Sequence, residues 1–227
     1  MRVLGLETAG AVCAVCVGDG GRVAALRCET MARGQDARII PLAQEALAEA
    51  GFALGAMDRF VALRGPGSFT GIRVGLAAAR GCAWSVGRPV LGVDRREVYR
   101  AQTAALSGPV AVVLESKRHE AFVAFLGLAA GPGAGADPEA WRLVAPEALA
   151  DIINAEAGVS WRIVGDGAVR LRGLVPEAFL IPEPPEPEVV TASTLAAALA
   201  AGDDPAFAPS PLYVRPPDVT LRKTGCA

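Results

Sequence analysis

The chain has 227 residues, which is enough for one large domain or two small ones. Hydrophobic residues make up 52% of it, so it can bury a core, and an intrinsically disordered protein is excluded. The formal net charge of −2 and the lack of a basic cluster argue against a protein that binds nucleic acid by itself.

The sequence indicates no membrane segment and no export signal. No uncharged apolar run reaches the roughly 18 residues that a spanning helix needs, and Glu7 interrupts the first apolar run before it can form a signal-peptide core. Five cysteines are an odd number for a disulfide framework. Cys13 and Cys16 lie in a strand-like run, where they would face opposite sides, so we interpret them as buried hydrophobic residues. We expect a cytoplasmic protein with reduced thiols and no membrane partner.

The first half of the chain predicts a meander of strands followed by alternating helices and strands. Three apolar runs joined by tight turns, one of them at 19–21, predict an antiparallel meander. The apolar positions then change to a helical period, and Gly51 ends the first helix. The predicted strands are 2–6, 12–17, 23–28, 60–63 and 90–93, and the predicted helices are 36–50, 70–86 and 95–102.

The second half repeats this pattern loosely. We predict a flexible loop at 129–138 and an extended proline-rich connector at 181–187. Alternating elements of this kind indicate a duplicated α/β fold with mixed sheets. We divide the chain into an N-terminal lobe of residues 1–103 and a C-terminal lobe of residues 104–227 that ends in a proline-rich tail. The predicted strands are 110–115, 121–126, 141–144 and 161–164, and the predicted helices are 146–156, 168–174 and 191–201.

The segment 64–81, RGPGSFTGIRVGLAAARG, is the most informative part of the sequence. Gly71, Gly75 and Ala79 are spaced four apart, so they share one face of the predicted helix. Glycine inside a helix costs about 0.5–1 kcal/mol relative to alanine. We infer that something packs very closely there, either an internal element or a partner subunit. A glycine-rich turn before a helix can also bind phosphate, but the lysine-containing pattern of nucleotide loops is missing.

The motif GPGSFTGIRVG, together with VLGLETA near the N-terminus, resembles the TsaB family, also called YeaZ. The resemblance extends over most of the chain. It includes the helix at 34–50, the strand RPVLGV at 88–93, the hairpin ESKRHEAFVA at 115–124 and PLYVR at 211–215. It implies the actin-like ATPase fold, built of two ribonuclease-H-like lobes with mixed sheets.

The resemblance also implies a function. The TsaB family is a non-catalytic relative of the TsaD family, which carries the chemistry, and the ATPase TsaE joins the two. Their assembly transfers a threonylcarbamoyl group to the adenosine beside the anticodon of tRNA. We therefore expect a scaffold and dimerisation subunit that reaches tRNA only through the complex, with a homodimer as the alternative when the chain is alone.

We expect the two long helices of the N-terminal lobe to be dimerisation helices that grip the partner in a four-helix bundle. The competing interpretation is that the small-residue stripe packs only against the chain's own sheet. The expected interface residues are Thr70, Gly71, Arg73, Val74, Gly75, Ala78 and Ala79 on one helix and Ile39, Leu42 and Ala46 on the other.

The resemblance identifies Glu7 and Thr8 as a vestigial nucleotide loop. The actin-like fold usually places an aspartate there, which coordinates magnesium through water. Glutamate is one methylene longer, so a magnesium site is in doubt, and a structural role for Glu7 is the alternative.

The catalytic relatives hold a metal through paired histidines, whereas His119 is the single histidine of this chain. We therefore expect no catalytic residue, no metal and no tightly bound cofactor, with ATP and metal used by the partner subunits. Two alternatives stay open, a glycoprotease-like metallopeptidase and an independent actin-like kinase. The kinase would need a second phosphate loop, which the sequence lacks.

Overall fold

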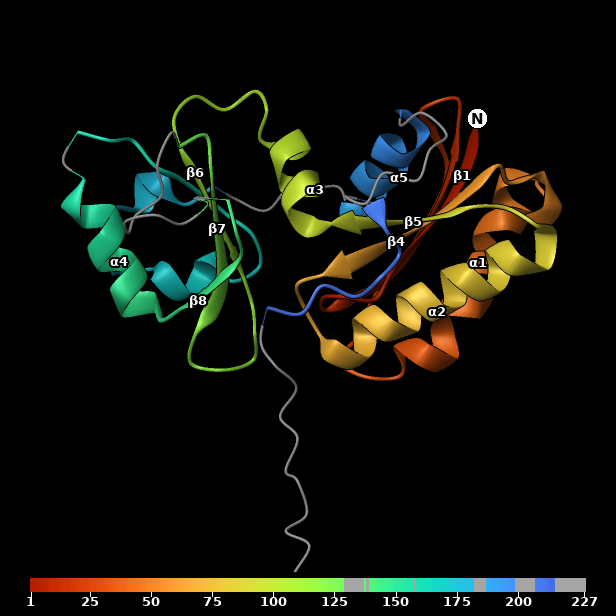
Figure 1. Cartoon of the computed structure of the whole chain (residues 1–227), viewed down its shortest axis with the longest axis horizontal. Helices are drawn as coiled ribbons and strands as arrows, with labels where there is room; N and C mark the ends of the chain where they lie inside the picture. The colour runs from red at the N-terminus through yellow and green to blue at the C-terminus, as the bar shows by residue number, and fades with distance from the viewer. Residues whose placement is uncertain (129–136, 138, 157, 182–186, 199–206, 215–227) are drawn as a thin grey trace, which may run out of the picture.

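The computed structural model describes residues 1–128, 137, 139–156, 158–181, 187–198 and 207–214. Two mixed sheets organise this part of the chain, and each carries its own helices (Figure 1). The first sheet has the strand order β3 (Arg22–Thr30), β2 (Val12–Asp19), β1 (Arg2–Glu7), β4 (Arg59–Gly65) and β5 (Val90–Asp94). The second has the order β8 (Arg142–Val144), β7 (Ala121–Leu126), β6 (Val110–Leu114) and β9 (Arg162–Val164).

The first sheet combines an antiparallel meander with parallel crossovers. β1 pairs with β2 and β2 with β3 in antiparallel fashion, as the tight turns predict. β4 pairs in parallel with both β1 and β5, and helices make the crossovers, as parallel strands require. These helices are α1 (Gln35–Ala50) and α2 (Phe69–Val86), and the short turn η1 (Leu54–Ala56) follows α1.

Helices cover both faces of the first sheet. α1 and α2 contact each other and lie on one face, whereas α5 (Glu188–Ala198) lies on the other (Figure 1). The strand β2 contributes to the cores on both faces of the sheet, because successive side chains of a strand point to opposite faces. Cys13 and Val15 belong to the core under α1 and α2, while Ala14 and Cys16 pack with Val189 of α5. Cys13 and Cys16 are free thiols buried on opposite faces, as predicted.

The second lobe is smaller and has its own core. Phe125 of β7 and the fully buried Trp161 meet edge to face with ring centroids 5.6 Å apart. α4 (Pro146–Ala155) contributes Leu149 and Ile153 to the same cluster. The remaining elements are α3 (Arg95–Gln102), which follows β5, and the short turns η2 (Ala168–Leu171) and η3 (Glu177–Phe179).

The end of the described chain returns to the first lobe. The buried guanidinium of Arg59 donates to the Ala196 carbonyl of α5 at 2.7 Å, and the Leu212 N–H donates to the Arg64 carbonyl of β4 at 2.7 Å. Residues 104–227 therefore do not all pack in the second lobe. The boundary at 103/104 stays a prediction for where the chain leaves the first sheet.

The predicted elements and the observed ones agree closely, with differences at their ends. The predicted helix at 168–174 is the single turn η2, and α5 begins at Glu188 rather than at residue 191. β-branched Val189 and Val190 are weak helix formers, and their burial against β2 outweighs that preference. The predicted loop, the proline-rich connector and tail, and residues 199–201 of the predicted helix lie largely or wholly outside the described residues. In the described part, no helix has both the length and the apolarity to cross a membrane.

Candidate functional site

The helix α2 carries the glycine motif and begins beside the end of β1. Its N-cap is Ser68, whose hydroxyl accepts a hydrogen bond from the Gly71 N–H at 3.2 Å. The Ser68 N–H in turn donates to the Ala9 carbonyl at 2.8 Å. The start of α2 is therefore fixed against the β1–β2 connection.

The small residues of α2 allow this close approach. The Thr8 hydroxyl donates to the Gly71 carbonyl at 2.7 Å. A Cβ atom at Gly71 would overlap the Thr8 carbonyl oxygen, and one at Gly75 would lie 2.7 Å from the Thr8 hydroxyl oxygen. The stripe of Gly71, Gly75 and Ala79 is buried against the chain's own β1, as the competing interpretation held.

The prediction that this stripe lies at a partner interface is therefore wrong, for a physical reason. A flat helix face permits any close neighbour, and here Thr8, directly after strand β1, occupies the space. The same correction applies to the three predicted interface residues of α1. Ile39, Leu42 and Ala46 are buried in the core between α1, α2 and the sheet.

The other face of α2 is exposed and partly aromatic. Trp84 is 88% exposed and Phe69 is 40% exposed. The Arg73 guanidinium lies 3.8 Å from the centroid of the Phe69 ring and donates to the Tyr213 hydroxyl at 2.7 Å. Of the predicted interface residues, Thr70 and Arg73 lie on this face, whereas Val74 and Ala78 are half-buried.

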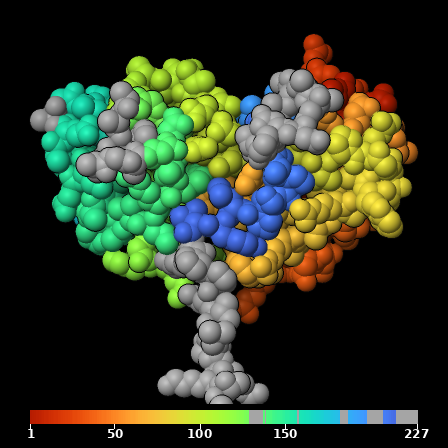
Figure 2. All heavy atoms as spheres, viewed as in Figure 1, coloured from red at the N-terminus to blue at the C-terminus, as the bar shows by residue number. Residues whose placement is uncertain are grey.

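The segment 207–214 extends this exposed face beyond the helix. Tyr213 stacks against Phe69 with ring centroids 5.0 Å apart. Arg80 of α2 donates to the Pro209 carbonyl at 2.5 Å. Figure 2 shows this segment lying across the molecule between the second lobe and α2.

A buried cluster of charges lies beneath the start of α2. The fully buried Arg95 donates to both carboxylate oxygens of Glu188, at 2.7 and 2.5 Å. It also donates to the Pro66 carbonyl at 3.1 Å and lies 3.7 Å from the Asp166 carboxylate of the second lobe. The Tyr99 hydroxyl completes the cluster with a hydrogen bond of 2.9 Å to Glu188. Arg95, the first residue of α3, thus links the turn before α2 to α5 and to the second lobe.

Glu7 lies beside this cluster. Its carboxyl accepts a hydrogen bond from the Val189 N–H at 2.9 Å. Burial raises the pKa of Glu7 to about 8, with the neighbouring charge of Glu188 adding to the effect and Arg95 opposing it. A carboxyl with this pKa is largely protonated at neutral pH. The predicted vestigial nucleotide loop stays a prediction, but Glu7 and Thr8 have structural contacts with α5 and α2.

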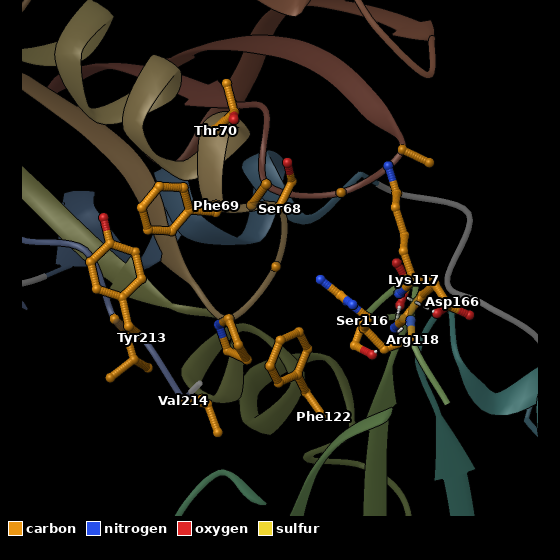
Figure 3. A pocket seen from close by; sticks show the side chains of 17 residues that line it. Ser68, Phe69, Thr70, Ser116, Lys117, Arg118, Phe122, Asp166, Tyr213 and Val214 are labelled. Carbon is orange, nitrogen blue, oxygen red and sulfur yellow. Dashed lines mark hydrogen bonds between the residues drawn. The ribbon is translucent and has the colours of Figure 1, made fainter. Parts of the chain in front are cut away.

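A cavity of about 730 Å³ lies between the two lobes. The first lobe contributes the β1–β2 turn and the start of α2, and the second lobe contributes the β6–β7 hairpin and Asp166 (Figure 3). Residues 212–214 close one side. The cavity therefore draws on three segments that are far apart in the sequence.

The described residues hold no group of three or more histidine, cysteine, aspartate or glutamate side chains that could bind a metal ion. His119 lies at the tip of the β6–β7 hairpin with its side chain 70% exposed, 3.7 Å from Glu147.

Sequence reasoning missed several of these residues. Phe69, Arg73 and Trp84 lie on one helical face of α2, and this period could have been read from the sequence. The Arg95–Glu188 pair and the contact of Tyr213 with α2 join residues 93 and 140 positions apart, for which no local signal exists.

The sequence resembles proteins of tRNA modification. Residues 28–129 match the family model described as tRNA N6-adenosine threonylcarbamoyltransferase, TsaD. The chain is 38% identical over 94 residues to the tRNA threonylcarbamoyladenosine biosynthesis protein TsaB of Escherichia coli, covering 41% of this chain and 40% of that protein. It is 23% identical over 122 residues to the Bacillus subtilis protein of the same name, covering 54% and 53%. The matches thus span about half or less of the length of these curated relatives.

Two solved structures share the fold over almost the whole chain. A Pseudomonas aeruginosa protein described as similar to the peptidase YEAZ superposes with a TM-score of 0.69 at 24% identity, covering 94% of this chain and 99% of that one. YeaZ from Pseudomonas aeruginosa superposes with a TM-score of 0.66 at 23% identity, covering 93% and 99%. These likenesses confirm the predicted fold class of two lobes with mixed sheets.

Proposed function

We propose that this chain is a member of the TsaB/YeaZ family and is the scaffold and dimerisation subunit of a tRNA threonylcarbamoyladenosine modification complex. Its partners are a TsaD-type catalytic subunit and a TsaE-type ATPase, and it pairs with a second copy of itself when it is alone. It meets tRNA only through the complex, consistent with its net charge of −2. The complex works in the cytoplasm.

The exposed face of α2 is the observation that carries this proposal. A tryptophan that is 88% exposed on a helix is unusual for a surface that only faces water. Tryptophan, tyrosine and arginine are the residues that dominate binding energy at protein interfaces. The aromatic–arginine face, which we define as Phe69, Arg73, Trp84 and Tyr213, has this composition. We place the partner-binding surface there, on the opposite side of α2 from the glycine stripe.

The contacts of the acidic residues support a non-catalytic role. Glu7 accepts a hydrogen bond from the Val189 N–H, and Glu188 is bound on both oxygens by Arg95. We propose that this chain holds no metal and no tightly bound cofactor, and that the partner subunits use ATP and metal. The metallopeptidase and the independent kinase are not favoured by the relatives that carry TsaB names.

Reconstitution tests the proposal. We expect the purified chain to leave tRNA unmodified, and to support modification when it is mixed with a TsaD-type subunit, a TsaE-type ATPase, tRNA and threonylcarbamoyl-adenylate. Leaving this chain out of the mixture should abolish or strongly slow the reaction. Modification at the same rate without the chain, or by the chain alone, would contradict the proposal.

The location of the partner surface has its own test. Trp84→Ala should weaken capture of the TsaD-type subunit in a pull-down, whereas Arg88→Gln, just beyond the end of α2, should not. Both positions are exposed, so circular dichroism and melting should show that both variants stay folded.

A further inference from the structure

We propose that residues 207–214, which we call the strap, hold Arg73 and Arg80 of α2 in position to bind two carboxylates of the TsaD-type partner. This inference rests on the proposed function. It adds the chemistry of the partner's surface, which is acidic, and a role for the strap, which positions the two arginines.

The strap is anchored on both lobes, and Figure 2 shows it lying across the molecule between them. At its start, Phe207 packs against the core of the first lobe. At its end, Val214 packs against a cluster of side chains from β6 and β7. A Cβ atom at Gly92 of β5 would lie 2.5 Å from the Ala208 carbonyl oxygen, so the sheet leaves room for the strap backbone at this position. The strap is therefore part of the packed structure.

Two arginines on the exposed side of α2 are held by oxygens of the strap. The Nε of Arg73 donates to the Tyr213 hydroxyl at 2.7 Å, and its guanidinium lies 3.8 Å from the centroid of the Phe69 ring. Figure 3 shows the Phe69 and Tyr213 rings side by side. Arg80 donates to the Pro209 carbonyl at 2.5 Å. Both acceptors are neutral oxygens, so the guanidinium groups are fixed while their positive charge is not neutralised.

The positive charge of this face is not balanced within the described chain. Elsewhere on the surface, Arg38 binds the acids Glu29 and Glu45. Among the described residues, Arg73 and Arg80 form no ion pair. Neither α2 nor the strap contains an aspartate or a glutamate. An acidic partner surface is the electrostatic complement of such a face.

The spacing of the two arginines suits a pair of carboxylates. They are seven residues apart, which is two helical turns, or about 10 Å along the helix axis. The exposed Ala77 between them has a small side chain, so a partner can reach both guanidinium groups. The planar guanidinium binds a carboxylate through two parallel hydrogen bonds. Only the Nε of Arg73 donates a hydrogen bond to a described residue, which leaves its two terminal nitrogens for the partner.

The strap lowers the entropic cost of this contact. A long side chain that moves freely in solvent loses rotamer freedom when it is fixed at an interface. The contacts with Tyr213 and Pro209 already restrict the two arginines in the folded chain. The Tyr213 hydroxyl is therefore a positioning group, because it acts on the partner through Arg73.

The experiment measures the dissociation constant of the full chain for a TsaD-type subunit by surface plasmon resonance. Arg73→Gln and Arg80→Gln should each weaken binding about tenfold or more, the effect of losing a charge-assisted hydrogen bond. Arg88→Gln is the matched control, since it removes an exposed charge beyond the end of α2, and it should bind like the wild type. Circular dichroism and melting should show that all variants stay folded.

Two further measurements test the charge of the partner surface. Raising the salt from about 0.1 M to about 1 M shortens the Debye length from about 10 Å to about 3 Å, and should weaken the wild type much more than the double variant Arg73→Gln/Arg80→Gln. Arg73→Glu should bind several-fold more weakly than Arg73→Gln, because like charges repel. Equal binding by these two single variants would contradict a carboxylate on the partner.

A double-mutant cycle tests the positioning role of the strap. Tyr213→Phe keeps the ring and removes the hydroxyl, and should weaken binding about threefold to tenfold. In the Arg73→Gln background, the same change should have no further effect. Effects that simply add would show that the Tyr213 hydroxyl does not act through Arg73, and would overturn this role.

The outcomes separate this inference from the proposed function. If the wild type does not bind the TsaD-type subunit, both are overturned. If the wild type binds and supports tRNA modification, but Arg73→Gln and Arg80→Gln bind equally well, the inference alone is overturned. It is also overturned if these variants reduce only the capture of tRNA by the complex, or only self-association of the chain. The face would then contact phosphate or a second copy.

Discussion

The two faces of α2 show what small and large residues each indicate. On one face, Gly71 and Gly75 lie against Thr8, directly after the chain's own first strand. On the other, Trp84 and Phe69 extend into solvent from a helix that does not need them for its core. Glycine marks a close approach without saying whether the neighbour belongs to the same chain. A contiguous exposed aromatic face is typical of a surface that binds another molecule.

On the buried side of α2, we expect stability to depend most strongly on Arg95. Its guanidinium holds the turn before α2 through a hydrogen bond to the Pro66 carbonyl. Arg95→Met leaves the largely buried carboxylate of Glu188 and the half-buried carboxylate of Asp166 without their cation. We expect a loss of about 3–5 kcal/mol in the free energy of unfolding, measured by denaturant titration. Arg38→Met is the matched control, since Arg38 pairs with Glu29 and Glu45 at the surface, and it should cost much less. Equal losses in the two variants would mean that burial does not set the value of these ion pairs.

Glycine-to-alanine exchanges compare the two faces within one helix. Gly71→Ala places a Cβ atom on the Thr8 carbonyl oxygen, and we expect it to cost about 1–3 kcal/mol or more. Gly81→Ala meets no atom within 4 Å on the exposed side, and we expect it to stabilise the protein by about 0.4–1 kcal/mol. Thermal melting of both variants tests this. Destabilisation by Gly81→Ala, or none by Gly71→Ala, would remove the distinction between the faces.

The exposed side should matter for association and not for folding. Trp84→Ala should weaken binding to the TsaD-type subunit by about 2 kcal/mol, the threshold for an interface hot spot, which is roughly thirtyfold in the dissociation constant. Its melting temperature should match that of the wild type. Surface plasmon resonance against the immobilised partner measures the effect. An unchanged dissociation constant would place the partner on another surface.

The pH dependence of stability reports on the buried side near Thr8. The pKa of Glu7 is about 8 in the folded chain, against an ordinary value of 4.5, because the carboxyl is buried near Glu188. The contribution of protonated Glu7 to the free energy of unfolding is fully present below about pH 4.5 and is lost as the pH rises through about 8. The slope is at most about 1.4 kcal/mol per pH unit for one proton.

The variant Glu7→Gln isolates this contribution, because its side chain does not titrate. We expect the wild type to lose unfolding free energy relative to the variant as the pH rises from 5 to 9. Two parallel curves would show that Glu7 titrates with an ordinary pKa.

The local elements of this fold could be predicted because they depend on local period and turn chemistry. Asp19, Gly20 and Gly21 turn the chain between β2 and β3, and Gly51 ends α1 in a left-handed conformation. The motif at 64–81 located α2 and indicated the resemblance to the TsaB family, since a long glycine-containing segment is a specific signal. The early start of α5 was missed because Val189 and Val190 favour strands by themselves.

The sequence by itself determined which segments form strands and helices, that the chain forms two lobes with mixed sheets, and that α2 has a face for close contact. Only the tertiary structure decided what meets that face. A helical period is a property of neighbouring residues, whereas the contacts of Gly71 with Thr8, Arg95 with Glu188 and Arg73 with Tyr213 join positions 63 to 140 residues apart. Such pairs exist only after strands and helices have packed, because long-range packing, and not local preference, brings distant residues within bonding distance.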